Sequence, residues 1–161
     1  MHMNDILILY YSKNDSTKKM ARAIARGIES SNVASSSIRT VHSDTYKETD
    51  DILVTKEDLK KCSGMIIGSP THFGNMAAPL KAFFDSTTDE WFNNTLESKL
   101  GGVFTSTSSM HGGQETTLIS MMMPLIHHGM IIAGVPYLSL IHISEPTRQA
   151  EMSYAVFCLK K

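Results

Sequence analysis

Short apolar runs alternate with amphipathic segments along most of this chain, and this alternation constrains the fold more than any other feature. The apolar runs predict β-strands, most of them buried on both faces, at residues 6–11, 33–41, 64–68, 103–106 and 130–135. Apolar residues recur at helical spacing in three longer segments, residues 17–29, 77–87 and 114–128. The chain therefore predicts an α/β fold, a three-layer, doubly wound parallel sheet with helices on both faces.

Three polar loops follow strands of this predicted sheet. In an open parallel sheet, ligands bind in the crevice beyond the carboxyl ends of the strands. The loops that lie there are SKNDST, SPTHFGN and TSTSSMHGGQE, at residues 12–17, 69–75 and 105–115. All three are rich in hydroxyl, amide and small side chains, so they form the candidate binding site.

The first loop joins a strand to the start of a helix. Its hydroxyl and amide groups and the free N–H groups of the helix N-terminus suit a phosphate monoester. Neither GxGxxG nor GxxxxGK[ST] is present, so the loop has no dinucleotide or triphosphate fingerprint. The alternative is a helix capped by ordinary polar turn residues.

The second and third loops each allow two interpretations. In the second, Pro70 stiffens the turn and Gly74 permits a positive φ. Phe73 is then either exposed to a flat ligand or folded back into the core. The third loop either presents its hydroxyls and backbone amides to a ligand or is flexible and without function. A separate signal, Thr55 followed by Asp58, predicts a capping box on a short helix.

Composition excludes several classes of partner. Fifteen basic against sixteen acidic residues give a net charge of -1, which offers no electrostatic reason to expect nucleic acid. The chain has no apolar run of membrane-spanning length, and its His, Cys, Asp and Glu residues lack metal-ligand spacing. Its two cysteines are far apart. We therefore expect a cytoplasmic protein without a metal and without membrane insertion.

The last segment breaks the alternation. Residues 138–148, LSLIHISEPTR, resemble the in-frame translation of a sequencing-library adapter. We therefore expect residues 138–161 to be a non-native tail and residues 1–137 to be one domain that lacks its closing C-terminal helix. The alternative is a genuine, divergent C-terminus. We assign no function to residues 138–161.

Four stretches together resemble a known family. YYSKNDSTKKMA, GSPTHFGNMAAPLKAFFD, GGVFTSTSSMHGGQETT and HHGMIIAGVPY are similar, in order and spacing, to the WrbA-type NAD(P)H:quinone oxidoreductases, which are flavodoxin-like and carry FMN. The resemblance covers nearly all of residues 4–137. It implies a flavodoxin-like sheet of order 2-1-3-4-5.

The resemblance also assigns roles to the three loops. It implies that the FMN phosphate is held by Ser12, Lys13, Asn14, Asp15, Ser16 and Thr17. It implies that Thr71, His72 and Phe73 contact the isoalloxazine and that Pro70 and Gly74 also belong to the cofactor site. The other edge of the ring would be lined by Ser106, Thr107, Ser108, His111 and Gly112.

Specific roles or effects are also expected at four positions, Asn14, Asp15, Trp91 and His127. Asp15 stands where glycine is common in the family, and Asp tolerates the left-handed conformation, so we expect weakened rather than lost phosphate binding. Asn14 falls near the expected nicotinamide site. The resemblance places His127 at the flavin, whereas the residues alone also allow a helix-capping role. It places Trp91 over the flavin, in one chain or from a neighbouring subunit, whereas the alternative is a half-buried anchor under a loop.

The resemblance implies a reaction and its partners. NAD(P)H would pass a hydride to the flavin N5, and a quinone would then take two electrons in the same pocket, which gives ping-pong kinetics. His127 or His72 would stabilise negative charge on the reduced ring. A dimer or homotetramer is expected. Two alternatives stay open: a flavodoxin-type one-electron carrier, although the net charge of -1 disfavours it, and a non-enzymatic flavin-binding module.

Overall fold

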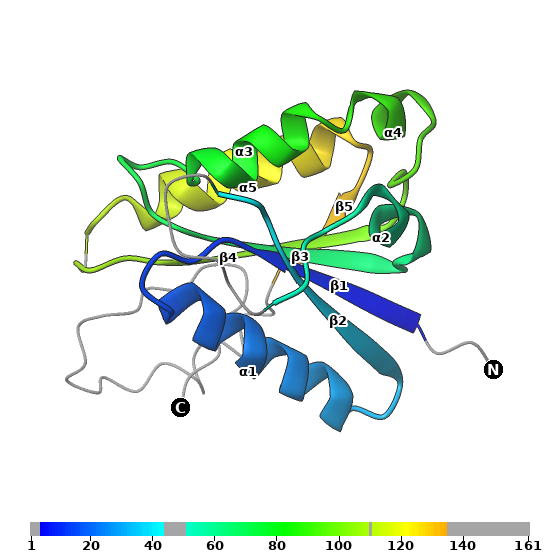
Figure 1. Ribbon diagram of the computed structural model, residues 1–161, viewed down its shortest axis with the longest axis horizontal. Coiled ribbons are helices and arrows are strands. Elements are labelled where there is room, and N and C mark those ends of the chain that lie inside the picture. The colour runs from blue at the N-terminus through cyan, green and yellow to red at the C-terminus, as the bar shows by residue number, and fades with distance from the viewer. Residues whose placement is uncertain (1–3, 44–50, 110, 135–161) are drawn as a thin grey trace.

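The predicted parallel sheet and its strand order are confirmed. The computed structural model describes residues 4–43, 51–109 and 111–134. Its strands pair in parallel in the order β2-β1-β3-β4-β5 (Figure 1). They are β1 (Asn4–Tyr10), β2 (Ala34–Thr40), β3 (Gly64–Pro70), β4 (Leu100–Ser106) and β5 (Ile131–Ile132). Of the predicted strand 130–135, only Ile131–Ile132 form β5 among the described residues. The expectations for residues 135–161 lie outside the described residues.

The helices agree with the sequence patterns, with one addition. They are α1 (Ser16–Ser30), α2 (Lys56–Lys61), α3 (Ala78–Asp85), α4 (Thr88–Phe92) and α5 (Gln114–His127). The capping box on α2 is confirmed, because the Asp58 N–H donates to Thr55 Oγ1 and the Thr55 N–H donates to the Asp58 carboxylate. The sequence patterns did not predict α4, since five residues are too few to display a helical period.

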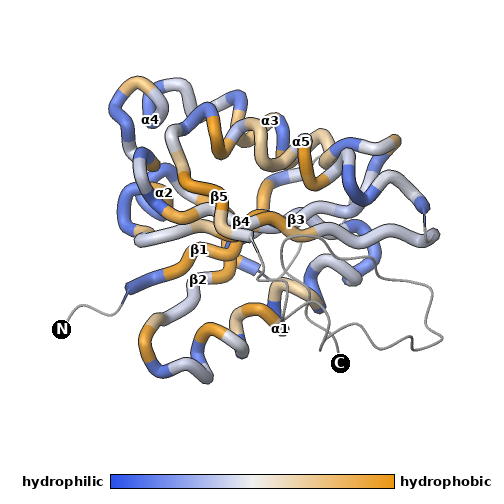
Figure 2. The backbone as a smooth tube through the Cα atoms, turned by 180° about the vertical axis from the view of Figure 1, so that it is seen from behind, coloured by the Kyte–Doolittle hydropathy of each residue, from blue (hydrophilic) through white to orange (hydrophobic). Residues whose placement is uncertain are grey.

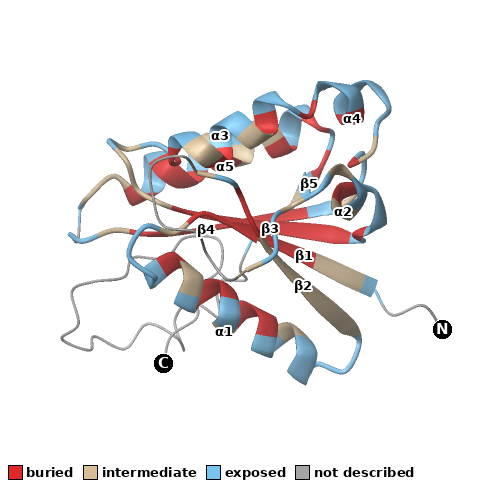
Figure 3. Ribbon diagram, in the orientation of Figure 1, coloured by how far each residue is buried: buried red, intermediate tan, exposed pale blue. Residues whose placement is uncertain are grey.

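Successive residues of the central strands face opposite layers. On β1, Leu7 and Leu9 belong to the core cluster under α2, α3 and α5, whereas Ile8 and Tyr10 belong to the cluster under α1. Figure 3 shows buried residues along β1, β3 and β4, and Figure 2 shows hydrophobic residues along these strands and α1. Burial on both faces explains why these strands read as continuous apolar runs rather than as alternating ones.

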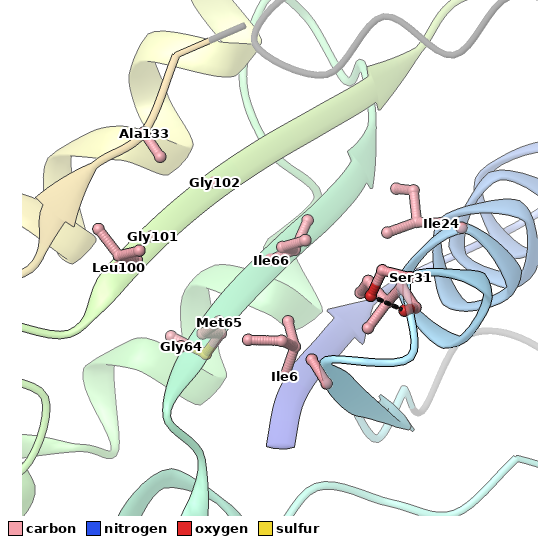
Figure 4. Close-up of a pocket in the computed structure, with 13 residues that line it drawn as sticks. Ile6, Ile24, Ser31, Gly64, Met65, Ile66, Leu100, Gly101, Gly102 and Ala133 are labelled. Atoms are coloured by element: carbon pink, nitrogen blue, oxygen red, sulfur yellow. Dashed lines mark hydrogen bonds between the residues drawn. The ribbon is translucent and has the colours of Figure 1, made fainter. Parts of the chain in front are cut away.

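The two faces of the sheet are covered unequally. Among the described residues, α1 is the only helix on its face, whereas α2 to α5 pack on the other (Figure 1). A groove of about 490 Å³ runs beside α1 over the β3–β4 half of the sheet (Figure 4). Aliphatic side chains and glycines line it, Ile24, Ile66 and Leu100 among them. Leu100 is 57% exposed.

Candidate functional site

The three polar loops meet at the carboxyl edge of β1, β3 and β4. Thr17 Oγ1, at the start of α1, lies 3.0 Å from Ser106 Oγ at the end of β4, and both residues are buried. The Thr71 N–H, just after β3, donates to the Ser106 carbonyl oxygen at 3.0 Å. Ser106 therefore joins the first and second loops, although 89 residues separate it from Thr17.

The start of α1 has the features of an anion site. Its N-cap, Asp15, has φ 60°, which is the left-handed conformation. Asp tolerates this conformation better than most residues, as expected above. The Asp15 side chain makes no capping hydrogen bond, and the first turn holds no acidic residue. Its N–H groups are therefore not satisfied by a side-chain cap and favour an anion. This geometry favours the phosphate interpretation over the capped helix.

The first loop also contains an unsatisfied hydroxyl. Within the described part of the chain, Ser12 Oγ is buried and has no hydrogen-bond partner. Buried polar atoms are nearly always paired, so an unpaired hydroxyl beside an uncapped helix start marks a candidate ligand-binding position. The side chains of Lys13, Asn14 and Ser16 are exposed around it. The loop therefore fits a terminal phosphate group.

The second loop presents an aromatic side chain to solvent. The His72 and Asn75 backbones exchange hydrogen bonds of 2.9 and 3.0 Å, which closes a tight turn with Phe73 at φ 52° and Gly74 at φ 73°. Phe73 is fully exposed, so it is not folded back into the core. A phenylalanine in the left-handed region is strained, and such strain concentrates at functional sites. His72 stacks edge-on against Tyr11, with ring centroids 6.3 Å apart.

The third loop packs directly on the second. A Cβ on Gly113, the N-cap of α5, would lie 3.0 Å from the Gly74 Cα, so only glycine permits this approach. Around it, Thr107 Oγ1 and Gln114 Nε2 both donate to the Ser109 carbonyl oxygen, at 2.7 and 3.1 Å. These bonds argue against a loose, functionless loop. Ser108 and His111 are exposed at its rim, and Gly112 is partly exposed.

Trp91 and His127 lie away from these loops in the same chain. They come together at the far end of α5, where Trp91 Nε1 donates to the His127 carbonyl oxygen at 2.7 Å. The helix has 14 residues and begins at the third loop, so about 20 Å separates its two ends. A cavity of about 230 Å³ adjoins Trp91 and His127. One chain therefore does not bring them to the loops.

His128, next to this pair, is a buried histidine with one orphan nitrogen. Thr87 Oγ1 donates to the Phe84 carbonyl oxygen at 2.6 Å and lies 2.8 Å from His128 Nε2, so Nε2 carries the proton and donates to it. Nδ1 is then a bare acceptor, buried and without a partner among the described residues. Burial lowers the pKa of His128; Lys56 and His127 lower it further, and the Glu90 carboxylate opposes them.

This lowered pKa predicts a pH-dependent stability. The unfolded chain binds a proton at His128 more readily than the folded chain does. The stabilising contribution is therefore complete above about pH 6.5 and is lost as the pH falls toward the folded pKa. We expect urea midpoints to fall with acidification in this window, and His128→Gln to flatten the slope. An exposed control, His111→Gln, should keep it; equal slopes in both variants would contradict the assignment.

The described residues contain neither a membrane-spanning helix nor a metal-binding cluster. No helix there combines the length and the apolar character that a membrane crossing needs. No three His, Cys, Asp or Glu side chains in the same residues are grouped closely enough to hold a metal ion.

Comparison with known proteins gives the family. A model of NADPH-dependent FMN reductases matches residues 5–144. The chain belongs to this family. It is 40% identical over 148 residues to the NAD(P)H dehydrogenase (quinone) of Chromohalobacter salexigens, with 84% of this chain and 73% of that protein covered. It is 41% identical over 145 residues to the enzyme of the same name from Paracoccus denitrificans, with 84% and 69% covered.

Solved structures of flavodoxins support the fold. A WrbA-like flavodoxin from Agrobacterium tumefaciens superposes with a TM-score of 0.66 at 24% identity and covers 80% of this chain and 75% of its own. Flavodoxin 2 from Bacillus cereus gives 0.60 at 20% identity, with 78% and 77% covered. At these identities the likeness establishes the flavodoxin-like fold of this family member and no more.

Proposed function

We propose that this chain is an FMN-dependent NAD(P)H:quinone oxidoreductase. The observation that carries the proposal is the meeting of an uncapped helix start, the orphan Ser12 hydroxyl and the exposed Phe73 at one edge of the sheet. The first two suit a phosphate, and the third suits a flat ring. Membership of the family and the quinone dehydrogenase names of relatives about 40% identical support it.

Each loop has a distinct task in this proposal. FMN, when bound, accepts a hydride from NAD(P)H and gives two electrons to a quinone. The N–H groups of α1 and the Ser12 hydroxyl hold the phosphate, with the Asp15 carboxylate weakening that hold. Thr71 and Phe73 orient the ring and shield one side of it. His72 stabilises negative charge that develops on the reduced ring.

We propose further that Trp91 and His127 serve the flavin of a neighbouring copy. Their distance from the loops along α5 requires a second chain for a shared site. The outer face of α5 supports association, because Ile119, Met123 and Ile126 lie on one stripe and are all about half exposed. The assembly is a dimer or tetramer, in which Asn14 is placed for the nicotinamide. We place the protein in the cytoplasm.

We also propose that residues 138–161 are a non-native tail. The groove beside α1, which no helix of the described residues covers, supports this, since a doubly wound sheet needs helical cover on both faces (Figure 4).

Cofactor release and turnover together test the function. The purified protein should release FMN on denaturation, identified by mass, and should oxidise NAD(P)H with benzoquinone in a ping-pong pattern. Ser16→Glu should weaken FMN binding roughly a hundredfold, because it adds a carboxylate to the proposed phosphate site, while an acidic first turn still suits the helix. Ser30→Glu, at the exposed far end of α1, is the matched control. Release of FAD, absence of flavin, or accumulation of a one-electron-reduced flavin would contradict the proposal.

A further inference from the structure

Three threonine hydroxyls form a chain behind the second loop. Thr117 Oγ1, on α5, lies 3.1 Å from Thr71 Oγ1, which lies 3.3 Å from Thr105 Oγ1 on β4. Thr105 and Thr117 are fully buried, and Thr71 is half-buried at the edge of the site. These three hydroxyls therefore link the core to the loop that carries Phe73.

The direction of these hydrogen bonds follows from the backbone. Thr105 Oγ1 donates its single proton to the Ser69 carbonyl oxygen at 2.7 Å, so toward Thr71 it can only accept. The Thr71 hydroxyl therefore donates its own proton to Thr105 Oγ1. Thr117 keeps its proton for the Gly113 carbonyl oxygen, at 2.8 Å, or for Thr71. The bond to Thr71 is the arrangement that places a proton between the two hydroxyls, and it leaves the Thr71 oxygen one lone pair with which to accept a further hydrogen bond.

We propose that Thr117 is a positioning residue that holds the Thr71 hydroxyl as a hydrogen-bond acceptor for the flavin ring. The oxidised ring carries one N–H group between two carbonyls, and an acceptor fixed in this way selects that group. Thr117 itself does not touch the cofactor. The Gly113 carbonyl oxygen lies 2.8 Å from the same hydroxyl, so Thr117 also lies against the turn that packs on Gly74. This inference rests on the proposed function.

The test is a double-mutant cycle on FMN affinity. Thr117→Val keeps the shape of the side chain and removes its hydroxyl; it should raise the Kd of the apoprotein for FMN roughly tenfold and shift the absorption maximum of bound flavin. Thr117→Ser should restore both. Thr71→Val should weaken binding by a similar factor, and the double variant should be no weaker than Thr71→Val, because Thr117 acts through Thr71.

The control is Thr40→Val. Thr40 is also buried and donates to a backbone carbonyl oxygen, that of Tyr10, at 3.0 Å. The Thr40→Val variant should lose a similar free energy of unfolding in urea melts. It should show neither the shift in flavin absorption nor the loss of FMN affinity. Additive effects of the Thr71 and Thr117 substitutions, or a Thr117→Val protein that binds FMN as the control does, would overturn the positioning role. Failure of the unmutated protein to bind FMN would instead overturn the proposed function.

Discussion

Replacing residues 138–161 with the C-terminal segment of the Chromohalobacter salexigens relative should raise the free energy of unfolding by about 5 kcal/mol. A helix that covers the groove beside α1 would bury several aliphatic side chains, each worth about 1.5–3 kcal/mol. The gain would rival the whole net stability of a domain, roughly 5–15 kcal/mol. Urea melts of the two chains, with solubility measured alongside, check this.

The control for this exchange is the same segment with serine in place of its groove-facing aliphatic residues. That protein should resemble the chain as it stands, because covering the groove without apolar contact gains little. The exposed aliphatic lining of the groove beside α1 should also drive aggregation of the original chain and of the serine control. Equal midpoints and equal solubility for the original and exchanged chains would show that residues 138–161 are a working terminus and that the non-native interpretation is wrong.

Coexpression of two inactive variants should restore quinone reductase activity. Ser16→Glu adds a carboxylate to the start of α1, and its repulsion of the phosphate should raise the Kd for FMN roughly a hundredfold. A chain with both Trp91→Ala and His127→Ala still binds FMN but lacks the groups that a neighbour lends. In mixed oligomers, the first variant supplies Trp91 and His127 to the flavin of the second.

The comparison needs each variant expressed alone as well as the mixture. Both variants change exposed or half-exposed side chains, so urea melts should show that they remain folded. Mixtures made after purification, without subunit exchange, should stay inactive. An activity equal to the average of the separate variants after coexpression would mean that each chain completes its own site.

Local sequence patterns predicted most of the fold. The runs that became β1 and β3 are buried on both faces, and this burial is the physical reason they contain few polar residues. The α2 cap was readable because Thr55 and Asp58 interact over three residues. By contrast, α4 has no period to detect, and its position is set by packing of Thr87 and Glu90.

The sequence predicted the candidate site only in part, because some of its contacts join residues that are far apart in the chain. Loop residues such as Ser12 and Phe73 stand in recognisable local motifs. The chain of Thr71, Thr105 and Thr117 exists only because β3, β4 and α5 lie side by side, so no local pattern announces it. His128 was hidden too, since its orphan nitrogen depends on a bond to Thr87, 41 residues away.

The length of α5 has a consequence for how the protein would be assayed. Its two ends separate the cofactor loops from Trp91 and His127. In the proposed shared site, a single chain holds the flavin, whereas turnover requires association of two chains. By mass action, turnover per chain should fall on dilution while the fraction of chains carrying flavin stays constant. Activity measured at nanomolar enzyme would then understate the capacity of the protein at cellular abundance.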